Sequence, residues 1–341
     1  MINFRFHLVS LVAVFLALAV GVVMGSTVID RAIVDRLSSQ IESVRRRSDA
    51  RRAENEQLKG EREQLRGFIE QVVPVAIGQR LRGVPVAVVA MRGVDGETVR
   101  AAAEMLRAAG ASVPGVAWIE PLLAAADPDT EAKLAQAVGE PAGPGTMAEA
   151  ALGALGHRLA AGAALSGAAT SASPGPADLL VALAAAGFLA FDTLGGPPVN
   201  LAAWPAPASR LLVIDGTQAK TEASTATLPL VRSASTAGAA VTLAEVFRPT
   251  ATVKTRGGVV RAVLDTPELA SRVATVDDLE DTRGRVALTL AVEELGHGRT
   301  GHYGEGPGAN RQLPEVPTTQ PPGETAADPR AVRTGQSGSN P

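Results

Sequence analysis

The chain contains no cysteine among its 341 residues. Disulfides are therefore excluded, and so are the thiolate ligands that Cu(I) and structural zinc prefer. Aromatic residues make up only 3% of the sequence, and histidine occurs four times. A core of this composition has to be built from Val, Leu and Ala. No Ser-His-Asp or Cys-His nucleophile system is apparent, so we expect no enzymatic activity.

Charged residues are missing from the N-terminal run Leu8–Ile29, which is 22 residues long. A helix of that length covers about 33 Å, enough for a hydrocarbon core of about 30 Å. We therefore predict a transmembrane anchor at 1–29. The competing interpretation is a cleaved signal peptide, but its apolar region is normally about 7–15 residues and follows a basic segment. Here Arg5 is the only fixed side-chain charge before the run, and no clean A-x-A site ends it.

The flanking charges leave the orientation of this span open. Arg31 and Arg36 follow it, against Arg5 and the α-amino group before it. The positive-inside rule therefore does not favour an external C-terminus, although long domains translocate largely regardless of such charges.

A heptad pattern follows the apolar run and predicts a coiled-coil stalk at 30–78. With Val34 at position a, eight of the twelve a and d positions are apolar, in strict 3-4 spacing. Asn55 at an a position is the residue type that fixes register and two-strandedness. We expect a parallel homodimer whose contact residues are Val34, Leu37, Ile41, Val44, Asn55, Leu58, Leu65, Ile69 and Val72.

Two other interpretations of the stalk exist. The helix could lie on its own globular domain as a single amphipathic helix. The basic cluster Arg45–Arg47 with Arg51 and Arg52 could contact nucleic acid or anionic lipid. This cluster has no interleaved aromatic residues and lies in the heptad frame, so we interpret it as a solvated helix face and expect no nucleic acid partner.

Residues 79–303 alternate short apolar runs with helical patterns. This alternation predicts an α/β domain with a doubly wound, Rossmann-like parallel sheet. Strands are expected at 84–90, 112–119, 210–214, 240–246 and 272–276. Helices are expected at 98–109, 129–138, 147–164, 178–187, 226–237 and 282–295, the last with Asp281 as N-cap and Gly296 as stop. The region 168–176 is expected to be a flexible connection, and 304–341 a disordered tail.

Ligands of open α/β sheets bind beyond the carboxyl ends of the strands. The candidate loops are Arg92–Glu97, Asp192–Gly196 and Asp215–Gln218, and none of these contains a phosphate-binding glycine signature. Their aspartates, Asp95 among them, could bind a metal or a sugar hydroxyl, but turn formation and helix capping explain them without a ligand. The acidic cluster Asp277, Asp278, Glu280 and Asp281 is similarly interpreted as capping of the last helix.

His297 and His302 flank a glycine-rich segment beside Tyr303, and two imidazoles there could bind Cu(II). Two ligands make an incomplete site, so both remain weak candidates and the metal ligands stay unknown. His7 and His157 stand alone in the sequence.

Three segments resemble the actinobacterial MctB-type family, named for mycobacterial copper transport protein B. They are Phe4–Ser26 (FRFHLVSLVAVFLALAVGVVMGS), Gly238–Val246 (GAAVTLAEV) and Ala274–Gly304, which contains VDDLEDTRGRVALTLAVEELGHGRTGHYG. The resemblance implies a membrane-associated copper-transport or copper-homeostasis protein of the cell envelope, with copper as its cargo. It also implies that the bulk of the chain lies outside the cytoplasmic membrane.

The residues themselves do not point to a copper carrier. One span cannot form a channel, and the family supplies no settled ligand set to place on this sequence. An alternative is a dimeric coiled-coil scaffold of the envelope that regulates cell separation or peptidoglycan remodelling through a protein partner. The family resemblance favours copper homeostasis, whereas the stalk and the missing soft ligands favour the scaffold.

Overall fold

The computed structural model describes residues 4–125, 127–139, 147–162, 178–249 and 256–315, without the side chains of residues 26–35. The chain divides into two compact units, Met1–Gln71 and Val72–Pro341. The predicted connection at 168–176 lies outside the described residues.

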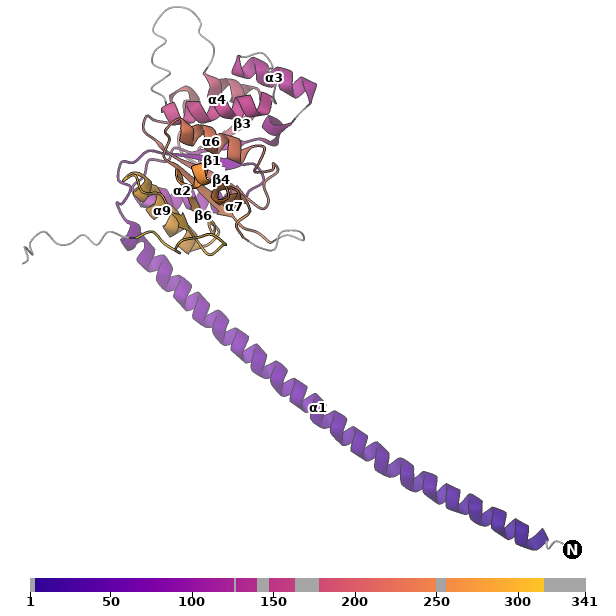
Figure 1. Ribbon diagram of the computed structural model, residues 1–341. Helices are drawn as coiled ribbons and strands as arrows, with labels where there is room; N and C mark the ends of the chain where they lie inside the picture. The colour runs from indigo at the N-terminus through magenta and orange to yellow at the C-terminus, as the bar shows by residue number, and fades with distance from the viewer. Residues whose placement is uncertain (1–3, 126, 140–146, 163–177, 250–255, 316–341) are drawn as a thin grey trace, which may run out of the picture. The chain divides into compact units, whose positions relative to one another are not determined.

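The first unit belongs to one long helix, α1 (Phe4–Ile77), which is drawn from indigo to purple in Figure 1. Its segment Phe4–Gly25 is long and apolar enough to cross a membrane, and none of it is buried. The predicted apolar N-terminal helix is therefore confirmed, with a start four residues earlier. The helix runs on without a break into the heptad region, so anchor and stalk differ in composition and not in backbone.

The second unit is an α/β domain around a seven-stranded sheet of order β3-β2-β1-β4-β5-β6-β7. The strands are β1 (Val86–Met91), β2 (Val116–Ile119), β3 (Leu189–Asp192), β4 (Arg210–Gly216), β5 (Val241–Val246), β6 (Val273–Val276) and β7 (His302–Tyr303). All neighbouring pairs are parallel except β2 with β3. The inner order β2-β1-β4-β5-β6 is that of doubly wound, flavodoxin-like sheets. The apolar strand pattern predicted the doubly wound class but not the order of the strands.

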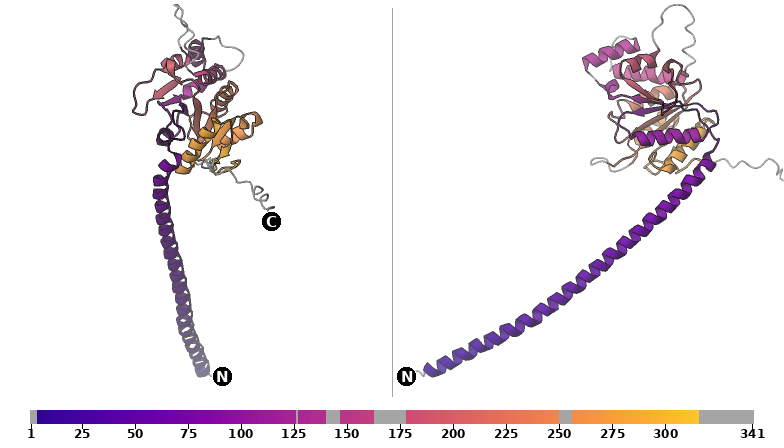
Figure 2. Two further views of the ribbon diagram at one scale, coloured as in Figure 1. Left: turned by 90° about the vertical axis from the view of Figure 1, so that its left-hand side faces the viewer. Right: turned by 180° about the vertical axis from the view of Figure 1, so that it is seen from behind.

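Helices cover both faces of this sheet. The α-helices are α2 (Gly96–Ala108), α3 (Pro128–Val138), α4 (Met147–Ala161), α5 (Leu179–Ala185), α6 (Thr227–Thr236), α7 (Gly258–Leu264), α8 (Pro267–Ala270) and α9 (Thr282–Leu295). Short 3-10 turns, η1 (Pro121–Ala124) and η3 (Leu201–Ala203), follow β2 and precede β4. In Figure 1, α4 and α6 lie on one side of the sheet, and α2 and α9 lie on the other. Figure 2 shows α2, in purple, from behind.

The core is aliphatic, as the shortage of aromatic residues requires. Strands β1, β2, β5 and β6 are buried at every position. Helices α4 and α6 approach closely because Gly156 has no side chain. A Cβ there would lie 2.7 Å from the Cβ of Ser233. The Ser233 hydroxyl also donates a hydrogen bond to the Gly153 carbonyl oxygen across 2.6 Å.

The predicted disorder of the tail is wrong for residues 304–315, which we call the C-terminal strap. The amide of Gly304 donates to the Arg311 carbonyl across 3.0 Å, and that of Asn310 to the His302 carbonyl across 2.8 Å. These backbone bonds hold a segment that contains few large apolar residues, so composition alone did not predict it. The remainder of the predicted tail, residues 316–341, is outside the described part of the chain.

Candidate functional site

The carboxyl edge of the sheet carries two of the three loops that the sequence singled out. The Arg92–Glu97 loop follows β1, and the Asp215–Gln218 segment ends β4, its neighbour. These two strands form the topological switch point, because the chain passes from β1 to β2 on one side and reaches β4 on the other. This is where doubly wound folds bind their ligands.

The switch point is filled by the chain itself. The Lys220 amide donates a hydrogen bond to the Arg92 carbonyl across 2.9 Å. Gly93 (φ 108°) lies so close to the Gln218 carbonyl oxygen that no Cβ would fit between the two loops. The two loops thus occupy the crevice in which a nucleotide would lie in this fold class.

Asp95 and Asp215 both have structural partners at this edge. Asp95 caps α2, accepting from the Thr98 amide across 3.2 Å and from its hydroxyl across 2.6 Å, and these hydrogen bonds lower the pKa of Asp95. It also pairs with Arg248 across 3.0 Å. Asp215 is buried, and burial raises its pKa although Thr227 and Gly216 donate to it. Capping therefore accounts for Asp95, as the sequence predicts.

The third loop, Asp192–Gly196, does not join the other two. Strand β3 runs antiparallel to β2 and places Asp192 opposite Val116, at the start of β2. The carboxyl end of β3 consequently lies at the opposite edge of the sheet from the carboxyl ends of β1 and β4. Placing this loop beyond the carboxyl edge was wrong, because the sequence pattern does not show strand direction. Asp192 accepts a hydrogen bond from the Leu194 amide across 2.8 Å, as expected for a turn.

The acidic cluster Asp277, Asp278, Glu280 and Asp281 follows β6 at the carboxyl edge of the sheet. Asp277 accepts hydrogen bonds from strap amides, Glu280 pairs with Arg256, and Asp278 is buried. Asp281 occupies the N-cap position of α9 with extended backbone, but its side chain makes no capping hydrogen bond. The predicted capping role is wrong for the Asp281 side chain, because the cluster is organised around the strap and the segment before α7 instead.

Glu245 is a neighbouring carboxylate that belongs to none of the loops predicted from the sequence. Glu245, in strand β5, is 1% exposed and accepts from the amides of Gly257 and Gly258 across 3.1 Å and of Val260 across 3.3 Å. It thereby holds the N-terminus of α7, and burial raises its pKa. A charged residue inside an apolar strand, VTLAEV, was the signal that could have identified it.

The histidine candidates lie near the end of α9. His302, in β7, has its Nδ1 3.0 Å from the Thr275 hydroxyl and also contacts the Ala270 backbone, and burial lowers its pKa. His297 is exposed just after α9. Across the described residues, no group of three or more His, Asp or Glu side chains is arranged to hold a metal ion.

The sequence pattern G-x-G-x-x-G occurs at Gly296–Gly301, outside the three candidate loops. It follows helix α9 and precedes β7, whereas the dinucleotide-binding motif follows a strand and opens a helix. This segment therefore lacks the backbone context that would make it a phosphate site.

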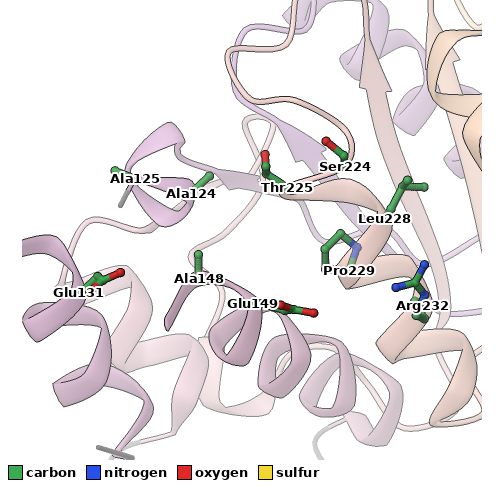
Figure 3. Close-up of a pocket in the computed structure, with 10 residues that line it drawn as sticks. All are labelled: Ala124, Ala125, Glu131, Ala148, Glu149, Ser224, Thr225, Leu228, Pro229 and Arg232. Atoms are coloured by element: carbon green, nitrogen blue, oxygen red, sulfur yellow. The ribbon is translucent and has the colours of Figure 1, made fainter. Parts of the chain in front are cut away.

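A hollow of 470 Å³ lies between η1, α3, α4 and the start of α6, and Figure 3 shows the residues that line it. Acidic side chains come from α3 and α4 and a basic one from α6, with small apolar residues between them. Its lining residues are Ala124, Ala125, Glu131, Ala148, Glu149, Ser224, Thr225, Leu228, Pro229 and Arg232. The hollow is open and its charges are mixed, so its chemistry indicates no single ligand class.

The predicted dimer contacts lie along α1. Of these residues, Leu37, Ile41, Val44, Asn55, Leu58, Leu65 and Val72 are exposed, and Ile69 is half-buried. The side chain of Val34 is outside the described residues. An exposed, mostly apolar stripe of this kind could pack against a partner helix.

Comparison with known proteins identifies a family. The family model described as "Copper transport outer membrane protein, MctB" matches residues 1–314. Proteins called copper transporter MctB from Mycobacterium tuberculosis and Mycobacterium bovis are each 26% identical to this chain over 328 residues. The alignments cover 91% of this chain and 98% of each relative.

Proposed function

The chain belongs to the MctB family, and from this membership we propose that it serves copper transport or copper homeostasis in the cell envelope. The observation that carries this proposal is the extent of the match. It runs from the apolar N-terminal helix through the α/β domain to the strap, and the mycobacterial copper transporters align over nearly their whole length. The proposed function thus concerns the whole architecture and not one shared segment.

The proposed mounting is a single uncleaved span with the α/β domain outside the cytoplasmic membrane. Phe4–Gly25 supports the span, because it is apolar and exposed along its length. The family description, which refers to an outer membrane protein, supports an envelope location. The side of the membrane on which the domain lies is part of the proposal.

The proposed assembly is a parallel homodimer through the stalk. In a parallel pair, Glu54 of one chain faces Lys59 of the other and Glu61 faces Arg66, and both pairs are attractive. Arg47 would face Arg52, which is repulsive, so the charge pattern favours a second copy at two of these three pairs. Leu58 and Leu65, 55% and 59% exposed, would be buried in this seam. A shared membrane plane favours the parallel arrangement.

The proposed mode of action is indirect and non-enzymatic: the protein holds no tightly bound copper and acts through an envelope partner. Two spans in a dimer are too few to enclose a pore. The chain has no thiolate, and the His302 ring already contacts Thr275 and the Ala270 backbone. The scaffold role in cell separation remains a separate prediction, and the comparisons lend it no support.

Copper measurements in cells test this function. A strain lacking the gene should accumulate more cell-associated copper in copper-supplemented medium, and the full chain should reverse this. A variant lacking residues 4–25 should fail to do so, whereas His297→Ala/His302→Ala should succeed. Equal copper in the deletion and parent strains would reject a role in copper homeostasis.

A binding measurement tests the indirect mode separately. Calorimetry of the full chain in detergent micelles, with Cu(II) and with Cu(I) under reducing conditions, should show no stoichiometric sub-micromolar site. A tight site that disappears in His297→Ala/His302→Ala would establish a direct copper role instead.

A further inference from the structure

The C-terminal strap is attached to the end of β6 by one carboxylate. The two oxygens of Asp277 each accept one backbone hydrogen bond, from the Glu305 amide across 2.9 Å and from the Gly306 amide across 2.7 Å. Gly304 (φ 135°) permits this approach, since a side chain at that position would overlap the Asp277 carboxylate. Backbone amides bind a carboxylate through charge-assisted hydrogen bonds, which are about twice as strong as neutral ones.

An ion pair makes the second attachment. Arg283, in the first turn of α9, contacts Glu305 across 2.5 Å. The same guanidinium lies 3.8 Å from Asp281. Arg283 is therefore a cation shared between the strap and the acidic cluster.

Asp278 is the member of the cluster without a direct partner. It is 2% exposed, and within the described part of the chain its Oδ1 has no hydrogen-bond partner. That oxygen lies against Gly284 in the first turn of α9, at 2.6 Å from the position a Cβ would take. Burial of an unpaired charge is costly, so this site favours the neutral carboxyl. Burial and the Asp277 carboxylate raise the pKa of Asp278 to about 6.

The charges around Asp278 come from four parts of the fold. They are Asp277, Glu280 and Asp281 on its own loop, Arg283 and Arg285 on α9, Arg256 before α7, and Glu305 on the strap. Arg256 pairs with Glu280, and Arg285 donates to the carbonyls of Leu279 and Glu280. Arg283 is the neighbouring cation whose partner belongs to the strap.

We propose that Asp278, Arg283 and the strap form a proton-dependent latch. When Asp278 is neutral, Arg283 pairs with Glu305 and the strap is held firmly on Asp277. When Asp278 ionises, it competes with Glu305 for Arg283. The added negative charge also repels the Glu305 carboxylate of the strap, and both effects weaken the attachment of the strap to the domain. The strap is thus firm in mildly acidic surroundings and loosens as the pH rises through the range in which Asp278 loses its proton.

Amide hydrogen exchange in the full chain, in detergent micelles, tests this latch. At about pH 5 and about pH 7.5, rates at Glu305 and Gly306 are compared after correction for intrinsic exchange. Protection should be about tenfold lower at the higher pH, which corresponds to about one pKa unit of coupling. Asp278→Asn should keep protection high at both pH values. The control Asp281→Asn, which removes an exposed carboxylate of the same cluster, should retain the pH dependence.

Arg283→Gln is the second variant, and it should lower protection at both pH values and remove the difference between them. Equal protection at the two pH values in the unmodified chain would overturn the latch. So would a pH dependence that persists in Asp278→Asn. Loss of protection throughout the domain would show that Asp278→Asn does not fold. In that case Arg283→Gln decides, and a pH dependence that persists in this variant would overturn the latch.

Discussion

Thr227 donates a hydrogen bond from its hydroxyl to Oδ2 of Asp215 across 2.6 Å, and both residues are buried. The bond joins the carboxyl end of β4 to the first residue of α6. A charged group that the sequence suggested as a ligand thereby fixes a helix at the edge of the sheet.

Thr227→Val keeps the shape of this side chain but removes its hydroxyl. We expect it to lower the free energy of unfolding by about 1–3 kcal/mol, because a buried carboxylate oxygen loses its partner. Urea denaturation should show the loss. Thr225→Val, at the exposed end of the same turn, should change stability by less than about 0.5 kcal/mol. Equal effects of the two substitutions would show that Asp215 does not depend on Thr227.

Gly156→Ala tests the close contact of α4 with α6. The new methyl group would meet the Cβ of Ser233 and the amide of Ala234 at 2.7 and 2.8 Å, so we expect a loss of about 1–3 kcal/mol. Gly153→Ala is the matched control, because nothing lies within 4 Å of its Cβ position. That substitution should raise stability by up to about 1 kcal/mol through helix propensity. Thermal unfolding of the two variants should move in opposite directions.

Asp278 should make stability depend on pH. Its pKa in the folded protein, about 6, exceeds the ordinary 3.8, so the folded state binds the proton more tightly than the unfolded state. The contribution of this residue is therefore favourable at low pH and is lost as the pH rises through about 6. Asp278→Asn should be more stable than the unmodified chain at about pH 7.5, by about 1–3 kcal/mol, with a smaller difference at about pH 5. A constant difference across this range would contradict the assignment.

Charge placed in the stalk seam should separate the proposed dimer. Leu58→Asp/Leu65→Asp puts like charges at two d positions, so sedimentation of the full chain in micelles should shift from dimer to monomer. Gln57→Asp/Gln64→Asp adds the same charge one position earlier in each heptad, at c, and should remain dimeric. Monomeric behaviour of the unmodified chain would reject the seam.

Asn55 offers a test in the opposite direction. Replacing it with leucine or isoleucine should raise the thermal stability of the stalk, because a polar group leaves the seam, and should broaden the distribution of oligomers. Circular dichroism and sedimentation of the same sample would measure both effects. An unchanged melting temperature would place Asn55 outside the seam.

Elements with a clear apolar or periodic pattern were predictable from the sequence, including the four-residue strand β6, and elements without such a pattern were not. Helix α9 has the bounds Thr282–Leu295 that its flanking residues predict, and β5 differs from prediction by one residue. Strands β3 and β7 were missed because neither has a continuous run of buried apolar residues, and both are outer strands that pair with β2 and β6. Helix α7 depends on Glu245, whose partners are distant in sequence.

The position of the candidate site was predictable from the sequence, but the contacts within it were not. The loops after β1 and β4 lie together at the switch point, as the apolar strands that precede them imply. Their filling by Lys220 and Gln218 could not be foreseen, because it depends on how closely Gly93 allows the second loop to approach. The attachment of the strap to Asp277 was likewise hidden, since the amides that bind it carry no signature in the sequence.

The sheet ends in short strands on both sides, which limits pairing with the sheet of another molecule. An outermost strand with free amides and carbonyls is a template on which another chain can add, and the risk grows with its length. Here the outer strands contribute four and two residues, and one of them runs opposite to its neighbour. Sheet-to-sheet association is therefore disfavoured, which is compatible with the proposed association of two copies through α1.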